Sequence, residues 1–535
     1  MKFTFLTGLL EQLKDKRRPW ETWWERVAFL TDPRFYGKIS GSYAAPGQIY
    51  TGRKKYDNTL AVGMMRWASA IEGLTTPRNE VWQNLRFTEG AEGYDSRVWA
   101  DRTRDKLFAR RYEAGSGFCR ANYAALYLMG VYGTSVMGVF KRPGGKIRYK
   151  AYGPKDWFID VNAQGEVDTF MRQFEVDDRG LTEIFGERAK EALSHDDLKT
   201  KHRVITAVIP NDYYIPGAPF KKNFRYTVMS WIEDKEYVLQ EDYLHVCPLI
   251  CQRYEPMPNL NDPYAMSLAM LASSDQSTLN EMVRMCLRAA DNQTSPVILG
   301  YQDNVDVKRL RPNMYVPGGV SAEGRPLVQP LALGGNQPFS LEWIRQYKQN
   351  ISDFLGLDLF MMLASKNKQM TAEEVRHLAQ EQAVMLGPLS ASRESQFLEP
   401  ETNINLQYGF EDGVFDPLPQ SVTQAAAEGH GNVVVEYDNP INRAQKMAQV
   451  NGTMQLISTA GMLDPIDPHV KKRVNADKIL QNTRDILGVD TDVLFSDEQV
   501  RQMDEAEAQA AQQQAQAAQM LQAAQLAAQQ QERLI

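Results

Sequence analysis

The stretch DPYAMSLAMLASSDQSTLNEMVRMCLRAADNQ, residues 262–293, decides the fold, because its pattern predicts one long uninterrupted helix. Asp262 suits the helix N-cap, and Pro263 suits the first helical position, where a backbone N–H has no partner to lose. No glycine or further proline follows until Pro296. The predicted helix therefore spans roughly 30 residues, on the order of 45 Å.

This predicted helix has two different faces, since successive residues are rotated by about 100°. Its apolar face consists of Leu279, Val283, Cys286 and Ala290. Its polar face is a mixed-charge stripe that consists of Glu281, Arg284, Arg288 and Asp291. Periodicity alone favours the plainer interpretation, a surface helix of an ordinary globular protein.

A small β insertion is predicted over residues 296–339. Short β-like pieces at 296–299, 314–316 and 327–328 alternate there with glycines. Helical periodicity returns at Ser340, a candidate N-cap, and continues to residue 355. The apolar arc of this second helix comprises Leu341, Ile344, Tyr347, Ile351, Phe354 and Leu355. Two long helices joined by a small β unit predict a projecting tip.

The loop 356–370 follows, with the sequence GLDLFMMLASKNKQM, and it carries Lys366, Asn367 and Lys368 after an apolar run. Thr371-Ala-Glu-Glu374 then forms a capping box, which predicts the start of another long helix. The Gly387-Pro388 pair is expected to kink this helix, because proline removes a backbone donor and clashes with the preceding turn. Residues 432–437 predict a strand.

Residues 1–135 predict a mainly helical part. Apolar positions recur at helical spacing over 11–30 and 59–71, and Trp20, Trp23 and Trp24 are predicted core residues. A further helical run, 96–129, is rich in basic residues, namely Arg102, Arg104, Lys106, Arg110 and Arg111. A DNA-binding patch is one interpretation of that run, and a solvated face or a contact with an acidic neighbour is the plainer one.

Strand signals replace helical ones from Ser135 to Val246. Alternating segments occur at 136–140, 147–152, 170–176, 204–209 and 226–232, with a turn at Pro143-Gly144-Gly145 and a helix over 181–193. The predicted fold class is therefore α+β, predominantly helical.

The C-terminal part predicts helices alone. Two of them, 443–458 and 468–487, are separated by Gly461 and two Asp-Pro turns. Ser496-Asp-Glu-Gln499 is a capping box, and about 36 residues rich in Ala and Gln follow it without Gly or Pro. This last segment predicts a helix that copies of the chain would stabilise, with a disordered low-complexity tail as the alternative.

Composition limits the function classes. The 535 residues, 43% of them hydrophobic, suffice for several packed domains. A net charge of −7 argues against broad capture of nucleic acid.

Cys247, Cys251 and His245 lie close in sequence, but no second ligand pair has zinc spacing, so neither a metal nor another cofactor is expected. The N-terminus lacks the features of a signal peptide and no stretch suits a membrane span, which predicts assembly in the cytoplasm.

Catalytic motifs are missing from the sequence. A phosphate-binding loop needs Gly-x-x-x-x-Gly-Lys-Ser/Thr, but Phe140 stands at the first glycine position before Gly145-Lys146, and Ile147 follows the lysine. Neither a nucleophile elbow nor a His-Glu-x-x-His pair occurs. No enzyme activity is expected. Because carboxylates are abundant, an active site built from acidic residues alone stays an alternative.

Five segments resemble the portal, or head-to-tail connector, proteins of short-tailed double-stranded-DNA phages. In chain order they are LAVGMMRWASAIEGLTTPRNEVWQNLRF (60–87), YLMGVYGTSVMGV (127–139), the helix with its continuation to TSPVIL (261–299), QMTAEEVRHLAQEQAVMLGPLSASRESQFLEP (369–400) and VEYDNPINRAQK (435–446). Each motif is loose, but their order and spacing extend over some 500 residues, nearly the whole chain.

The resemblance implies a portal fold with a wing, stem, clip, crown and C-terminal helical barrel. The implied parts are the wing (1–261), the first stem helix (262–295), the clip (296–339), the second stem helix (340–355), the tunnel loop (356–370), a long kinked helix returning to the wing (371–439), the crown (440–495) and the barrel helix (496–535). It also implies a ring of twelve subunits at one capsid vertex of the virion.

Site residues and partners are implied in the same way. Lys366, Asn367 and Lys368 would face DNA in the tunnel, where a lysine is a sequence-independent phosphate contact. Lys308, Arg309, Arg311 and Arg325 would contact partners at the clip, or bridge neighbouring subunits. The implied partners are the terminase large subunit, tail adaptor and tube proteins, scaffold and major capsid protein, internal head proteins, and double-stranded DNA passing through the channel. A packaging ATPase or nuclease, and a filament or scaffold protein, are the competing interpretations.

Overall fold

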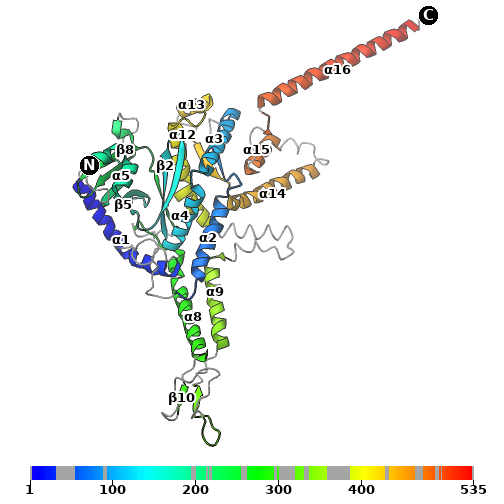
Figure 1. Ribbon diagram of the computed structural model, residues 1–535. Coiled ribbons are helices and arrows are strands. Elements are labelled where there is room, and N and C mark those ends of the chain that lie inside the picture. Colours follow the sequence, from blue (N-terminus) through cyan, green and yellow to red (C-terminus); the bar gives the residue numbers. More distant parts are fainter. Residues whose placement is uncertain are drawn as a thin grey trace. The chain divides into compact units, whose positions relative to one another are not determined.

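The computed structural model describes residues 3–31, 55–87, 93–193, 201–212, 215, 220–254, 262–294, 298–300, 320–330, 337–357, 386–427, 433–463, 474–487, 493–495 and 497–532. The chain forms two compact units. Unit 1 comprises Met1–Arg78 and Arg110–Asp412, and unit 2 comprises Asn79–Ala109 and Gly413–Ile535. Both helices and sheets are present (Figure 1), which confirms the α+β class.

Unit 1 contains most of the strands. Its five-stranded antiparallel sheet has the order β4-β5-β6-β7-β8, and the strands are β4 (Phe158–Val161), β5 (Val167–Asp177), β6 (Lys201–Pro210), β7 (Tyr226–Ile232) and β8 (Tyr237–Leu244). A three-stranded sheet has the order β3-β2-β9, from β2 (Thr134–Arg142), β3 (Lys146–Tyr152) and β9 (Leu249–Arg253). β10 (Ile298–Gly300) pairs with β11 (Val328–Pro330). The strands predicted between Ser135 and Val246 and the turn after β2 are confirmed, whereas the β-like piece predicted at 314–316 lies outside the described residues.

Helices cover these sheets and extend from them. Those of unit 1 are α1 (Phe3–Thr31), α2 (Thr59–Thr75), α4 (Phe118–Tyr132), α5 (Asp178–Phe185), α6 (Glu187–Ala192), α7 (Leu268–Leu271), α8 (Ser273–Thr294), α9 (Gln337–Phe354) and α12 (Glu399–Glu411), with a short 3-10 turn at Phe220–Asn223. A π-helical turn, Glu394–Leu398, precedes α12.

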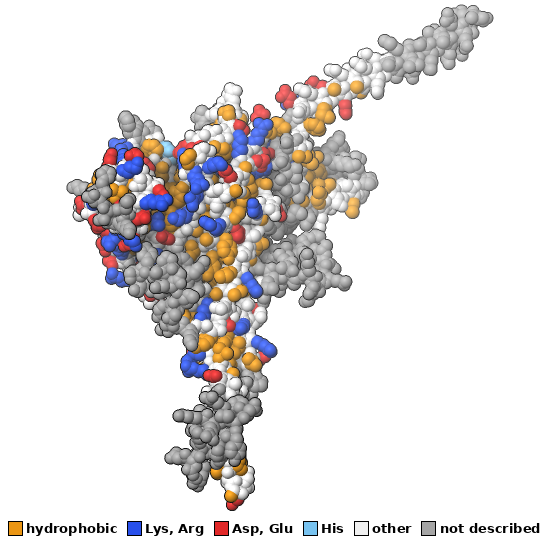
Figure 2. All heavy atoms as spheres, viewed as in Figure 1, with side chains coloured by type: hydrophobic (Ala, Val, Ile, Leu, Met, Phe, Trp, Pro, Cys, Tyr) orange, Lys and Arg blue, Asp and Glu red, His pale blue; other side chains and the backbone are white. Residues whose placement is uncertain are grey.

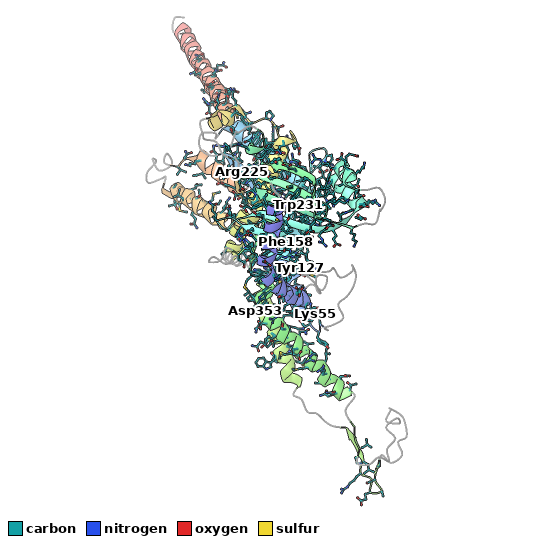
Figure 3. The ribbon with its side chains drawn as sticks, turned by 90° about the vertical axis from the view of Figure 1, so that its left-hand side faces the viewer. Lys55, Tyr127, Phe158, Arg225, Trp231 and Asp353 are labelled. Carbon is teal, nitrogen blue, oxygen red and sulfur yellow. The ribbon has the colours of Figure 1, made fainter. Side chains whose placement is uncertain are left out.

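Two of the hydrophobic cores described in unit 1 involve α1. Leu6, Leu10 and Leu13 of α1 pack on one face of the five-stranded sheet, against Phe158 and Trp231 among others; Figure 3 shows these last two residues beside α1. The larger core joins α1, α2, α4, α7, α8 and the end of α9. Trp24 and Trp20 contribute to it as predicted, whereas Trp23 is 44% exposed and is no core residue.

The helix predicted from Asp262 begins later, at Leu268, so that prediction is wrong at its start. Asp262 instead accepts hydrogen bonds from the Trp20 indole and from the backbone N–H of Tyr264. Residues 263–267 are not helical. The backbone N–H of Ala265 donates to the Thr134 hydroxyl of β2, and the Ser267 hydroxyl donates to the Val131 carbonyl of α4. The Ser267 side chain also caps α7 by accepting from the backbone N–H of Met270. A break at Ala272 then separates α7 from α8. Tertiary contacts therefore override the Asp-Pro start signal.

Unit 2 is mostly helical. Its helices are α3 (Tyr94–Tyr112, which ends in unit 1), α13 (Gln420–Ala427), α14 (Pro440–Leu463), α15 (Ala476–Leu487) and α16 (Asp497–Glu532). Its one described sheet pairs β1 (Gln83–Phe87) with β12 (Val433–Tyr437) in antiparallel register. Trp82 packs beside these strands, with its ring centroid 5.4 Å from that of Phe108 and 6.5 Å from that of Tyr437.

Three helix predictions for the second half of the chain have different outcomes. The final helix is confirmed, since α16 spans 36 residues after the predicted capping box. The predicted end at Gly461 is wrong, because α14 continues through this glycine to Leu463. The helix predicted at Ser340 starts at Gln337. The capping box at 371–374 lies outside the described residues.

Candidate functional site

The pair formed by α8 and α9 carries the sequence-predicted polar face. The two helices run side by side (Figure 1) and belong to unit 1. Near the core Leu279, Ile351 and Leu355 are fully buried between them, and Val283, Ile344 and Tyr347 are half-buried. Burial therefore decreases along α8, away from the core.

Large apolar side chains remain exposed on this helix pair. Met285 and Leu287 of α8 are 58% and 54% exposed, and Leu341, Trp343 and Phe354 of α9 are exposed as well. A pair of helices buries only the stripe where they touch, so the other apolar positions need a further partner. Contiguous exposed apolar surface is typical of a protein interface.

The mixed-charge stripe of α8 is only partly internally paired. Arg284 donates from two nitrogens to both oxygens of Glu281, and these bonds lower the pKa of the Glu281 carboxyl below its ordinary value. Arg288 and Asp291 are exposed. The prediction that these four residues occupy one polar face of a helix agrees with their place on α8, while a role in binding stays a prediction.

A buried carboxylate joins α8 and α9 to the start of α2. Asp57 lies just before α2 and accepts hydrogen bonds from the backbone N–H of Thr59 (2.8 Å) and from the Gln276 amide (3.2 Å). Lys348 of α9 forms an ion pair with it at 3.1 Å. Burial by itself would raise the pKa of Asp57, but these hydrogen bonds outweigh it and hold the pKa below its ordinary value.

Sequence reasoning missed this junction, although Asp57-Asn58-Thr59 precedes an apolar periodic run and has the composition of a helix start. Asn280 of α8 completes it by accepting from the backbone N–H of Tyr56 at 2.7 Å. The junction fixes where α8 and α9 leave the core of unit 1.

The basic run on α3 is used for ion pairs within the chain. Arg104 pairs with Asp101 and Asp105, and Lys106 pairs with Asp416 in the same unit. The last turn of α3 lies in unit 1, where Arg110 pairs with Asp412 and Arg111 with Glu401. Four of the five basic residues are thereby neutralised by nearby carboxylates, which disfavours the DNA-patch interpretation.

The remaining predicted site residues fall mainly outside the described residues. These are Lys366, Asn367 and Lys368 of the loop, and Lys308, Arg309 and Arg311 of the β insertion. Arg325 is described, and it lies in an exposed turn between Val320 and Pro326, where its backbone N–H donates to the Ser321 hydroxyl at 3.2 Å. The turn presents the Arg325 side chain to solvent.

The thiols of Cys247 and Cys251 lie in an apolar environment. Burial raises the pKa of both to about 12. Within the described residues no group of three or more His, Cys, Asp or Glu side chains is close enough to hold a metal ion.

None of the helices in the described ranges is both long and apolar enough to cross a membrane.

The chain belongs to the family of bacteriophage head to tail connecting proteins, whose sequence model matches residues 4–494. The match includes the α8–α9 pair and parts of both units but ends before α16, and it confirms the resemblance that the five segments carry.

The chain is similar to the probable portal protein of Bordetella phage BPP-1, with 24% identity over 506 residues. It is similar to the portal protein of Salmonella phage epsilon15 as well, with 24% identity over 501 residues. Each alignment covers 90% of this chain and 86% of the relative, so the similarity extends over most of both proteins.

Proposed function

We propose that the chain is a portal subunit and forms a closed ring at one vertex of the phage head. The observation that carries this proposal is the exposed apolar surface of α8 and α9 in a member of the head to tail connecting family. In a ring, the exposed side chains of one subunit, Met285 and Leu287 among them, would pack on the helix pair of the next. A closed cyclic assembly buries the same surface in every subunit.

In this proposal the stem around the channel consists of segments 262–295 and 340–355, which contain α8 and most of α9. The β insertion 296–339 is the clip, and the loop 356–370 is the tunnel loop. The wing consists of 1–261 with 371–439, the crown of 440–495 and the barrel helix of 496–535. Twelve subunits would place twelve copies of Lys366 and Lys368 around passing DNA, as mobile contacts to phosphate that carry no sequence preference.

The proposed ring is a structural conduit without catalysis. It would nucleate head assembly with scaffold and major capsid protein, pass double-stranded DNA during packaging and ejection, and dock the terminase large subunit and later the tail adaptor at the clip. Arg325, exposed in its turn, would be one clip contact. The crown and barrel would meet internal head proteins, through exposed apolar residues such as Met462 and Leu480.

The native mass and the end-on electron-microscope image of the purified protein test the ring. Twelve chains of 60.8 kDa would weigh about 730 kDa. A ring of that mass with a central hole wide enough for duplex DNA is the expected result. A monomer that hydrolyses ATP or cleaves DNA would contradict the proposal and favour the competing interpretation, a packaging ATPase or nuclease.

The barrel helix has its own test. Truncation after Phe495 removes α16 and is expected to leave rings intact while shortening them at one end. An unchanged outline of the ring in side view would contradict the barrel.

A further inference from the structure

One face of the five-stranded sheet is only partly covered. The other face packs on α1 through Leu6, Leu10 and Leu13. On the partly covered face, α5 and α6 shield one end, where Leu181 and Ala189 meet Val204 and Ile232. The rest of this face borders a cavity of about 560 Å³, whose other side is formed by β2, β3 and α12 of the same unit. Its volume lies within the range of small-molecule sites, about 300–1,000 Å³.

The floor of the cavity is a row of polar side chains across four strands. Arg172 of β5, Thr206 of β6, Ser230 of β7 and Gln240 of β8 are successive cross-strand partners. All four line the cavity. The hydroxyl oxygens of Thr206 and Ser230 are 3.0 Å apart, so they bond to each other and keep further capacity for a ligand.

The walls are apolar and mainly aromatic. Six rings line the cavity, those of Phe140, Tyr152, Trp157, Phe174, Phe185 and Tyr408. Val208 and Val228 border the polar row on the floor. Flat apolar groups pack well against such walls, because aromatic faces offer large contact areas at a low entropy cost. Figure 2 shows apolar and basic side chains gathered together in the region between β5 and β2.

Charge is distributed unevenly along the row. At the β5 end, the Arg172 guanidinium lies 4.3 Å from the Phe174 ring centroid and 5.1 Å from that of Tyr152, and the Lys150 amine lies 4.9 Å from the Tyr152 ring. At the β8 end, Asp242 accepts a hydrogen bond from Gln240. Three strand spacings, roughly 14 Å, separate the two ends. The cavity is therefore positive at β5 and negative at β8.

At the positive end, Arg172 forms an ion pair with Asp156, with 3.5 Å between Nη2 and the carboxylate oxygen. The Nε atom of Arg172 takes no part in this pair and is buried without a hydrogen-bond partner among the described residues. Lys141, which also lines the cavity, is neutralised by two carboxylates, those of Glu411 and Asp412. Burial, and after it the nearby Arg172 and Arg148, lower the pKa of Lys150 and outweigh the opposing effect of Asp156.

We propose that this cavity binds a small amphipathic carboxylate. The aromatic or aliphatic body of the ligand lies between the rings, over the Thr206–Ser230 pair, and its carboxylate lies at the β5 end between Arg172 and Lys150. An anion there would supply the hydrogen-bond acceptor that Arg172 Nε lacks, and would separate two like charges. Every residue that lines this site belongs to unit 1 of one chain.

Calorimetric titration of the purified protein with 2-naphthoate tests the proposal. Saturable binding of one molecule per chain is expected, about tenfold tighter than for the neutral 2-naphthamide, because a charge-assisted hydrogen bond is lost with the amide. Equal affinity for the two compounds, or no saturable binding of either at millimolar concentration, would overturn the proposal. Binding only of a peptide with an acidic aromatic end, and not of free naphthoate, would overturn it too.

Variants locate the binding. Arg172→Met should weaken 2-naphthoate about tenfold and leave 2-naphthamide unchanged, whereas Val228→Trp should abolish binding of both by filling the floor. Arg179→Met is the matched control, since Arg179 is exposed on α5 and does not line the cavity. If Val228→Trp disturbs folding, Gln240→Trp on the edge strand β8 blocks the same floor. Wild-type affinity in a folded blocking variant places the ligand elsewhere and contradicts the proposal.

Discussion

Arg111 and Glu401 form a two-point ion pair that is completely shielded from solvent. Arg111 Nε donates to Glu401 Oε1 at 3.0 Å, and Nη2 donates to Oε2 at 2.6 Å. Neither side chain exposes any surface. The Tyr149 hydroxyl and the Asn405 amide donate to the same carboxylate, so β3, α12 and the end of α3 meet at one buried group.

Removing one partner of this ion pair should lower the free energy of unfolding far more than removing both. Arg111→Met leaves a buried carboxylate without its cation and should lower the free energy of unfolding by about 3–5 kcal/mol. Arg111→Met with Glu401→Leu should recover most of that loss. Urea unfolding followed by tryptophan fluorescence measures both, and an additive double variant would contradict the coupling. The exposed pair Lys190–Glu187 is the control, with an expected cost under about 1 kcal/mol.

Gly133 is expected to tolerate no side chain. It ends α4 with φ +80°, and a Cβ there would stand 1.9 Å from the carbonyl oxygen of Ala265. Gly133→Ala should lower the free energy of unfolding by more than about 2 kcal/mol, since backbone strain and a backbone clash add. Gly144 has φ +79° and no atom near the position of an added Cβ. Gly144→Ala therefore adds backbone strain without a clash and should lower the free energy of unfolding by about 1 kcal/mol. Equal losses in thermal unfolding would rule out the clash.

The Asp57 junction predicts a stability that depends on pH. Because the folded pKa of Asp57 lies below the unfolded value, its contribution is present above about pH 4 and is lost as the pH falls through the folded pKa. Asp57→Asn should therefore be less stable than wild type by about 1–2 kcal/mol at pH 7. The difference should shrink below about pH 4. A difference in unfolding midpoint that stays constant from pH 7 to pH 3 would contradict this assignment.

The exposed apolar residues of α8 predict an assembly defect. Met285→Asp with Leu287→Asp should leave the secondary structure of the chain unchanged, because both side chains are exposed within one subunit. In the proposed ring these carboxylates would be buried without partners, so the sedimenting species should shift from the ring to smaller forms. Asn292→Asp with Gln293→Asp adds the same two negative charges at exposed polar positions of α8 and is the control. Intact rings from the double variant would contradict the interface.

The loop lysines predict a defect in DNA handling alone. Lys366→Ala with Lys368→Ala should leave the ring intact but alter packaging or retention of the genome, because mobile phosphate contacts are lost around the channel. Lys146→Ala with Lys190→Ala removes two exposed lysines elsewhere and should have no effect. Unchanged packaging and retention in the loop variant would remove the proposed role of Lys366 and Lys368.

Much of the candidate site could be read from the sequence, because it depends on local periodicity. A rotation of about 100° per residue predicts the two faces of α8, with Leu279 on the buried face and Glu281 and Arg284 on the polar face. The Asp57 junction could not be read in that way. Its members Asp57, Gln276 and Lys348 are far apart in the sequence, and only packing brings their side chains together.

The amino-acid sequence by itself determined the α+β class, most strands, the long final helix and the family. These features depend on short-range patterns, such as alternation in β6 and the capping box before α16, and on the order of motifs along the chain. Tertiary structure alone decided where the helix after Asp262 begins, how Arg110 and Arg111 are neutralised, and that a polar row crosses four strands beneath aromatic walls. The physical reason is that these features depend on contacts between distant residues, whose free energies outweigh local propensity.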